Sequence, residues 1–191
     1  MIELYAIAGH PGPPLPSVAS LREVTSDGLA AVCASHVEHE ASPEALWRHE
    51  AVVEALMEDR DLLPVRYGTC VEDEAAVARV LDERRDGLLD ALDRVRGAVE
   101  LSVRGHDPTV DTTDPVATMR GHEVHAELSR LARESARRRG RDPGEVLRGA
   151  YLVERDSVQA FVAEVARLQE AHDELSLLCT GPWPPYTFAE R

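Results

Sequence analysis

Near the N-terminus, Ile2, Leu4, Ala6 and Ala8 place apolar side chains at every second position, which is the spacing of a β-strand. Residues 2–8 therefore predict a strand, and the proline-rich residues 10–17 predict a loop that cannot continue it. Residues 21–25 and 29–35 predict a hairpin, because the Asp27–Gly28 pair between them favours a tight turn.

Helical spacing follows. Residues 42–59 predict a helix that Ser42 caps and whose first position is Pro43. The residues expected on its inner face are Leu46, His49, Val53 and Leu56. Residues 62–69 predict a strand with Pro64 at its start or on an edge, and Gly68 is expected where φ is positive. Residues 72–97 predict a second helix with a kink at Gly87.

The second half of the chain alternates strands with helices. The pattern predicts a strand over residues 98–105, a helix over 122–140, a strand over 147–155, a helix over 157–172 and a strand over 175–179. This order matches most of a ferredoxin-like unit. The predicted fold class is therefore α+β, with two small α+β domains: an N-terminal domain over 1–96, a C-terminal domain over 97–179 with a modified ferredoxin-like fold, and a docking tail over 180–191.

The tail concentrates aromatic residues in an aromatic-poor chain. Aromatic residues make up 4% of the sequence, yet Trp183, Tyr186 and Phe188 stand within six positions among three prolines. Prolines remove ladder donors, so the segment is not expected to form another central strand. Exposed aromatics would forfeit burial energy, and we expect Trp183 and Phe188 to be buried against the body, bridging the two domains.

Composition narrows the functional classes. The net charge of −14 weighs against nucleic-acid binding, which needs a basic surface. No apolar run approaches the length of a membrane span, and the N-terminus does not resemble a signal peptide. Cys33, Cys70 and Cys179 are few and far apart, which favours reduced thiols in a cytoplasm.

Two histidine pairs have helical spacing. His36 and His39, and likewise His122 and His125, are each three residues apart, and a nearby acid could complete a zinc site. Neither pair has the spacing of a known zinc motif, so solvated histidines are the expected interpretation. No metal or other cofactor is predicted.

One other set of residues could carry chemistry. His49, Glu50 and Arg66 would suit acid–base catalysis if they converged on a pocket. The alternative interpretation is structural, with His49 packed on the inner helix face and Arg66 paired with an acid. No nucleophile elbow, phosphate loop, dinucleotide fingerprint or CxxC motif is present in the sequence, so no catalytic residue is assigned.

Two sequence motifs, one central and one terminal, resemble those of a known protein family. The central motif contains Trp47, His49 and Glu50, followed by residues 63–69 (LPVRYGT), and the terminal motif is residues 180–188 (TGPWPPYTF). Together with the first strand, they make nearly the whole chain similar to the gas vesicle protein family GvpF/GvpL. Small departures are Tyr67 in place of the usual phenylalanine, and less common residues at Ala6 and Thr187.

The resemblance implies a non-enzymatic accessory or minor structural protein needed to form gas vesicles, the gas-filled protein shells that give some microbes buoyancy. It implies contact with the hydrophobic major shell protein and other gas vesicle accessory proteins, with neither nucleic acid nor membrane as a partner, and localisation to the gas vesicle inside the cytoplasm. The residues expected to serve structure or interaction are Trp47, His49, Glu50, Pro64, Arg66, Tyr67, Gly68, Thr69, Trp183, Pro184, Pro185, Tyr186 and Phe188. A ligand-sensing regulatory module and a small-molecule enzyme using His49, Glu50 and Arg66 remain the alternatives.

Overall fold

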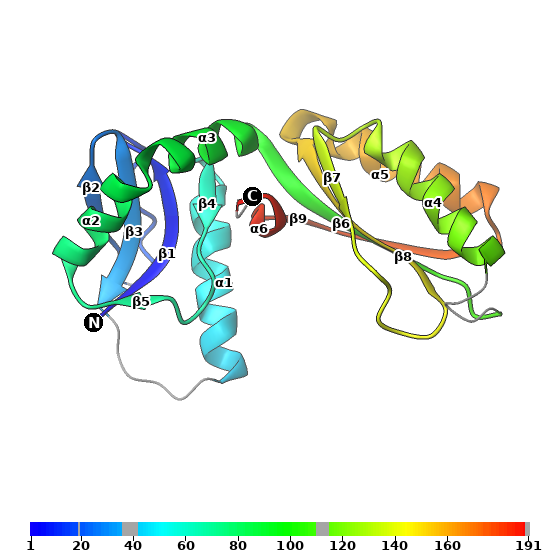
Figure 1. Ribbon diagram of the computed structural model, residues 1–191, viewed down its shortest axis with the longest axis horizontal. Coiled ribbons are helices and arrows are strands. Elements are labelled where there is room, and N and C mark those ends of the chain that lie inside the picture. Colours follow the sequence, from blue (N-terminus) through cyan, green and yellow to red (C-terminus); the bar gives the residue numbers. More distant parts are fainter. Residues whose placement is uncertain (19, 36–41, 110–114, 190–191) are drawn as a thin grey trace. The chain divides into compact units, whose positions relative to one another are not determined.

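The computed structural model describes residues 1–18, 20–35, 42–109 and 115–189 (Figure 1). By its internal contacts the chain divides into two units, which we describe separately. Unit 1 comprises Met1–Arg96 and Pro184–Arg191, and unit 2 comprises Gly97–Trp183. Unit 1 is therefore built from both ends of the chain.

Unit 1 contains an antiparallel sheet and four helices among the described residues. Its elements are β1 (Ile2–Gly9), β2 (Arg22–Ser26), β3 (Leu29–Ser35), α1 (Pro43–Met57), β4 (Leu62–Pro64), β5 (Cys70–Val71), α2 (Glu74–Glu83), α3 (Arg85–Val95) and α6 (Tyr186–Ala189). The strand order is β2-β3-β1-β4, and β5 also pairs with β1. The predicted first strand and hairpin are confirmed.

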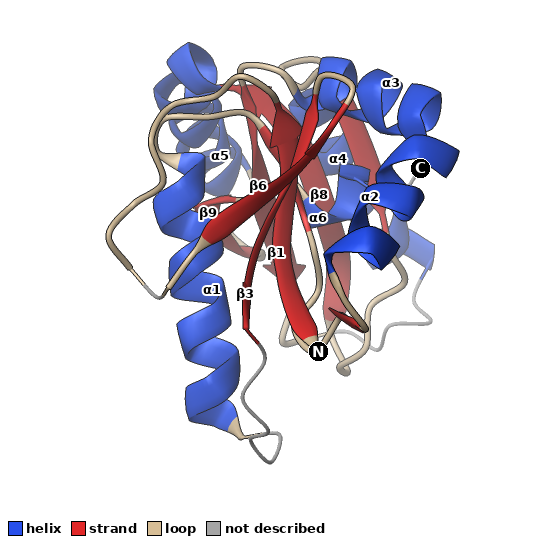
Figure 2. Ribbon diagram, turned by 90° about the vertical axis from the view of Figure 1, so that its left-hand side faces the viewer, coloured by secondary structure: helices blue, strands red, loops and turns tan. Residues whose placement is uncertain are grey.

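Helices cover both faces of the unit 1 sheet. Figure 2 shows α1 on one side of β1 and β3, with α2 and α3 on the other. The predicted start of α1 is confirmed, since the Ala45 amide donates to Ser42 Oγ at 3.2 Å and Pro43 is the first helical residue. His49 is buried on the inner face as predicted, but Leu46 is 44% exposed, so its assignment to that face was wrong.

The helix predicted over residues 72–97 is two helices. The break falls at Arg84, whose φ of −109° leaves the helical range, and Gly87 lies inside α3 rather than at a kink. The break lets each half bury its own apolar face, because α2 packs on β2 and β3 while α3 packs on β1 and β4. Val77 and Leu81 are buried in the first half, and Leu88 and Leu92 in the second.

Unit 2 contains a second antiparallel sheet. Its elements are β6 (Ala98–His106), α4 (Pro115–Ser129), β7 (Glu134–Arg137), β8 (Glu145–Glu154), a 3-10 turn (Arg155–Ser157), α5 (Val158–Ala171) and β9 (Ser176–Trp183). The strand order is β7-β8-β6-β9. Figure 1 shows α4 and α5 on the same side of the sheet. The core between them includes Val124, Leu128, Tyr151, Phe161 and Val165.

The helix predicted over residues 122–140 ends at Ser129, and residues 134–137 form β7 instead. The arginines of this stretch resemble the basic end of a helix, but pairing with β8 overrides that local preference. Ala136 is buried opposite Ala150, and the Arg137 guanidinium donates to the Val146 carbonyl at 2.9 Å. The pairing of β7 with β8 depends on residues from a separate segment, so the hydrophobic periodicity of residues 134–137 does not reveal it.

The end of the last strand corrects the predicted tail boundary. Residues 180–183 are part of β9, an edge strand, and not of a separate tail. The ladder register shifts between the pairs Glu100–Trp183 and Ser102–Thr180, and such an irregularity on an edge tolerates Pro182. Gly181 fits this position because its φ is +121° and an added Cβ would lie 2.8 Å from the Glu100 carbonyl oxygen. Among the described residues, no helix is long and apolar enough to cross a membrane.

Two glycines within helices give opposite predictions. A Cβ at Gly121 in α4 would lie 2.1 Å from the Val146 carbonyl oxygen, so Gly121→Ala should destabilise the chain by about 1–3 kcal/mol or more. A Cβ at Gly87 in α3 would meet nothing within 4 Å, so Gly87→Ala should stabilise it by about 0.5–1 kcal/mol. Urea unfolding of both variants measures this difference, and equal effects would contradict the close packing of α4 on β8.

Candidate functional site

The buried imidazole of His49 lies at the centre of the first motif. The side chain extends from α1 and the residue is 2% exposed. Its Nδ1 lies 3.2 Å from Glu3 Oε1 on β1, and its Nε2 lies 2.8 Å from the Val65 carbonyl oxygen. Carboxylate and carbonyl oxygens only accept, so both hydrogen bonds form together when both ring nitrogens carry hydrogen. One side chain thereby links three segments of unit 1.

Two tyrosines enclose the imidazole. Tyr5 stacks on His49 with ring centroids 4.8 Å apart, and Tyr67 meets it edge-on at 5.7 Å. The Tyr5 hydroxyl donates to Glu3 Oε2 at 3.5 Å. Burial, reinforced by the Glu3 charge, raises the pKa of Tyr5 to about 12, so the phenol remains a neutral donor at physiological pH.

The turn after β4 is fixed by its own hydrogen bonds. The Thr69 amide and hydroxyl both donate to the Arg66 carbonyl, at 3.2 and 2.8 Å. Gly68 has a φ of +79°, which confirms the prediction for this glycine. The Leu4 amide donates to the Thr69 carbonyl at 3.0 Å, so β1 holds the far end of the turn. Pro64, the last residue of β4, is buried.

A cavity of about 620 Å³ lies beside this cluster. Its wall includes Glu3, Tyr5, Arg48, His49, Tyr67 and Gly68. Sequence reasoning found His49, Tyr67 and Gly68 but missed the other three. A signal was present for Glu3, since an acid within an apolar strand next to the N-terminus has to face a polar partner or solvent.

The proposed catalytic trio does not converge. Among the described residues, the cavity wall includes His49 but neither Glu50 nor Arg66. The Glu50 carboxylate instead accepts from the Tyr186 hydroxyl at 3.3 Å, and Arg66 is exposed. Trp47, on the same helix, is 75% exposed.

The C-terminal segment packs within unit 1. Phe188 is fully buried, Pro184 and Pro185 are buried, and Arg94 Nη1 donates to the Phe188 carbonyl at 3.3 Å. Burial raises the pKa of Glu50, although its contacts with His49 and Tyr186 act in the opposite direction. Burial also raises the pKa of Tyr186, and the nearby Glu50 carboxylate raises it further.

Trp183 departs from the prediction. It is 41% exposed, so the expectation that it would be largely buried was wrong. The residue ends the edge strand β9, where its indole Nε1 donates to Thr180 Oγ1 at 3.3 Å. A partner inside the same strand satisfies the indole nitrogen without burying the ring.

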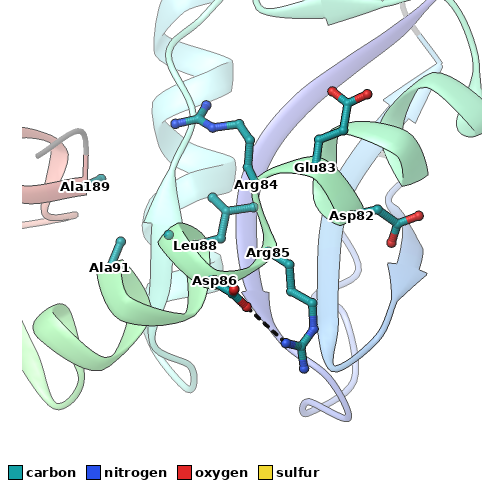
Figure 3. A pocket seen from close by; sticks show the side chains of 9 residues that line it. Asp82, Glu83, Arg84, Arg85, Asp86, Leu88, Ala91 and Ala189 are labelled. Carbon is teal, nitrogen blue, oxygen red and sulfur yellow. Dashed lines mark hydrogen bonds and ion pairs between the residues drawn. The ribbon is translucent and has the colours of Figure 1, made fainter.

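A second hollow of unit 1, about 510 Å³, lies at the junction of α2 and α3 (Figure 3). Charges of both signs surround it, and Arg85 pairs with Asp86 at 3.2 Å and with Asp27 at 2.7 Å. Figure 3 also shows the side chains of Ala91 and Ala189 near one another, in keeping with the packing of α6 on α3. The charge of Arg85 is thus offset by two carboxylates.

The histidine pairs are not brought into a metal site within the described ranges. His125 Nδ1 lies within hydrogen-bond distance of the Tyr151 hydroxyl, at 2.8 Å, and burial lowers the pKa of His125. No group of three or more His, Cys, Asp or Glu residues in the described part of the chain could hold a metal ion. His36 and His39 lie outside the described residues.

Comparison with known proteins gives consistent matches. The model of a family described as "Gas vesicle synthesis protein GvpL/GvpF" matches residues 4–120 and 115–190. Gas vesicle protein F2 of Halobacterium salinarum is 32% identical over 154 residues, covering 79% of this chain and 70% of that protein. Gas vesicle protein L of a Streptomyces species is 31% identical over 185 residues, covering 76% and 69%. The crystal structure of GvpF from Anabaena sp. PCC7120 superimposes with a TM-score of 0.83 at 22% identity, covering 100% of this chain and 96% of that one, which supports the fold.

The two aromatic residues of the terminal motif should differ in their contribution to stability. Phe188→Ala should lower the free energy of unfolding by about 3–5 kcal/mol, because the ring is fully buried. Trp183→Ala should lower it by about 1 kcal/mol or less, since the side chain is exposed at a strand end. Chemical denaturation of both variants tests this, and a larger loss for Trp183→Ala would contradict the described packing.

The Tyr186–Glu50 hydrogen bond gives a pH-dependent prediction. The pKa of Tyr186 is raised in the folded chain, so its stabilising effect is full below the unfolded value of about 10 and is lost as the pH rises above it. Tyr186→Phe should lower the free energy of unfolding by about 1 kcal/mol at neutral pH. The stability difference from wild type should shrink between about pH 9 and about pH 12. A stability difference that stays constant over this range would contradict the prediction. Tyr5 and Tyr151 are present in both proteins, so their contributions to the pH dependence cancel in the difference.

Proposed function

Since the chain belongs to the GvpL/GvpF family of gas vesicle synthesis proteins, we propose that it is a non-enzymatic accessory or minor structural protein that contacts the hydrophobic major shell protein during gas vesicle assembly. Other gas vesicle accessory proteins are the further partners in this proposal, and the gas vesicle inside the cell is the place of action. The observation that carries the proposal is the exposed Trp47 on α1, within the central motif.

The exposed indole supports a contact surface rather than a structural role. Trp47 is 75% exposed while His49, two positions later, is 2% exposed. Residues two positions apart on a helix point about 200° away from each other, so burial of His49 directs Trp47 outward. Leu46, next to it, is 44% exposed. Exposed aromatic and aliphatic side chains together are typical of protein-contact sites.

The net charge supports the same role. At −14, copies of this chain repel one another, which keeps a complex with an aggregation-prone partner dispersed. The separation of Glu50 and Arg66 from the His49 cavity favours the non-enzymatic assignment over the small-molecule enzyme.

We propose the following domain organisation. The N-terminal domain is residues 1–96 completed by the docked residues 184–189, and the C-terminal domain is a modified ferredoxin-like fold. The β-α-β-β-α-β order of unit 2 and its strand order β7-β8-β6-β9 support the second assignment. Burial of Phe188 and the Tyr186–Glu50 hydrogen bond support the docking of the tail.

A ligand-sensing module is the second candidate function. The cavity beside His49, about 620 Å³, lies within the size range of small-molecule sites. Recovery of a stoichiometric metabolite from the purified chain would favour this candidate.

The contact surface can be tested by substitution in vesicle-forming cells. Trp47→Ala should change the free energy of unfolding by less than about 0.5 kcal/mol, because the side chain is exposed. It should nevertheless reduce both vesicle formation and co-purification of the shell protein. Met119→Ala is the matched control, since Met119 is a large apolar residue, 55% exposed, on α4 of unit 2.

Two outcomes separate the parts of this proposal. Normal vesicle formation with Trp47→Ala would remove Trp47 from the contact surface. Normal vesicle formation after deletion of the whole gene would overturn the proposed function itself.

A further inference from the structure

The strand order places β9 at one edge of the unit 2 sheet, with β6 as its neighbour among the described residues. Leu177 lies opposite Gly105 of β6, but its amide donates to the side chain of Gln169, so this pair is of the non-hydrogen-bonded kind. Cys179, two residues further on, faces the same way. The peptide groups of both residues therefore point outward, where an edge strand offers N–H and C=O groups to another chain.

The side chain of Gln169, on α5, occupies one end of this edge. Its Nε2 donates to the carbonyl oxygen of Leu175, just before β9, at 2.5 Å, and its Oε1 accepts from the Leu177 amide at 2.6 Å. These partners fix the orientation of the side-chain amide, because a carbonyl only accepts and an N–H only donates. A residue of an added parallel strand would bond to the same two groups in the same way. Gln169 thus takes the place of a neighbouring strand.

The irregular register near Gly181 closes the other end of the edge. Pro182 has no N–H to offer, and the ladder shifts between the pairs Ser102–Thr180 and Glu100–Trp183. In the described part of the chain, the outward groups left between the two closures are the Leu177 carbonyl and the backbone of Cys179. Without the Gln169 side chain, the open stretch would run from residue 175 to residue 179.

The strand has no charged residue to keep other chains away. Charged residues make up 29% of the chain, yet the eight residues of β9 include none. Leu178, in the middle of the strand, is 58% exposed. Edge strands commonly carry charged side chains that discourage pairing, and an uncharged, apolar edge favours it. Here the side chain of Gln169 on α5 covers part of that edge instead.

We propose that Gln169 blocks the β9 edge against pairing with β9 of a second copy of this chain. A second copy presents the same edge wherever the protein is concentrated, and two identical edges can pair about a two-fold axis. The net charge of −14 also separates copies, but salt screens that repulsion, whereas the two hydrogen bonds of Gln169 act at the edge itself. This surface lies in unit 2 and is independent of Trp47 in unit 1.

The test compares full-length variants by sedimentation equilibrium in about 0.5 M sodium chloride, which screens the net charge. With increasing protein concentration, Gln169→Ala should raise the weight-average mass toward about twice that of wild type, because edge-to-edge pairing joins two copies. Gln169→Asn should do the same, since its shorter side chain cannot reach both partners. The control is Gln159→Ala, the same change at an exposed position of α5, and its mass should match wild type.

A second measurement follows the hydrogen bond directly. In dilute protein, the Leu177 amide should exchange its hydrogen at least about tenfold faster in Gln169→Ala than in wild type, because it loses its acceptor. Gln159→Ala should leave this exchange rate unchanged.

Four results would overturn the proposal. An unchanged mass in both Gln169 variants would show that the uncovered edge does not pair. An equal rise in Gln159→Ala would assign the association to a general effect of altering α5. A rise in Gln169→Ala alone would assign it to the alanine surface rather than to the open edge. Fast exchange of the Leu177 amide in wild type would show that Gln169 does not cover the edge in solution. Melting curves verify that all variants are folded, and Gln169→Asn keeps the test decisive should Gln169→Ala unfold.

Discussion

The imidazole of His49 joins α1 to two acceptors on different segments of unit 1, Glu3 on β1 and the Val65 carbonyl after β4. Burying a polar ring is unfavourable unless its nitrogens are bonded, and here both are. Loss of either partner would leave a buried polar group unsatisfied. The position of α1 on the sheet and the shape of the adjoining cavity therefore depend on this one side chain.

The next residue of the same helix, Glu50, connects α1 to the C-terminal segment of unit 1. Glu50 accepts a hydrogen bond from Tyr186, which lies 136 positions away in the chain. Phe188, two residues after Tyr186, is fully buried. All of unit 2 lies between these partners in the chain. Contacts of such long sequence separation close a large loop, which costs entropy. Unit 1 is complete only when residues 184–189 are docked.

The sequence predicted those parts of the fold that local pattern determines. Alternation predicted β1, the turn at Asp27–Gly28 predicted the β2–β3 hairpin, and capping chemistry predicted the start of α1 at Ser42. It also indicated burial of His49, from helical spacing alone. Partners distant in sequence determine the rest: β7 forms because β8 pairs with an arginine-rich stretch that otherwise resembles a helix end, and Trp183 belongs to an edge strand whose irregular register admits proline. The cavity wall likewise combines residues from β1, α1 and the turn at Tyr67, and no spacing rule links these segments.

The net charge of the chain and its exposed indole act through different physics. A chain of net charge −14 repels other acidic proteins, and this repulsion weakens as salt is added. The proposed contact at the exposed indole of Trp47 would act through apolar area, which salt does not screen. Because burial of His49 sets the direction of Trp47, the interaction that stabilises unit 1 also determines where this apolar surface is presented. If Trp47 makes the proposed contact, a substitution at His49 would disturb stability and contact at the same time, because the two side chains stand two residues apart on one helix.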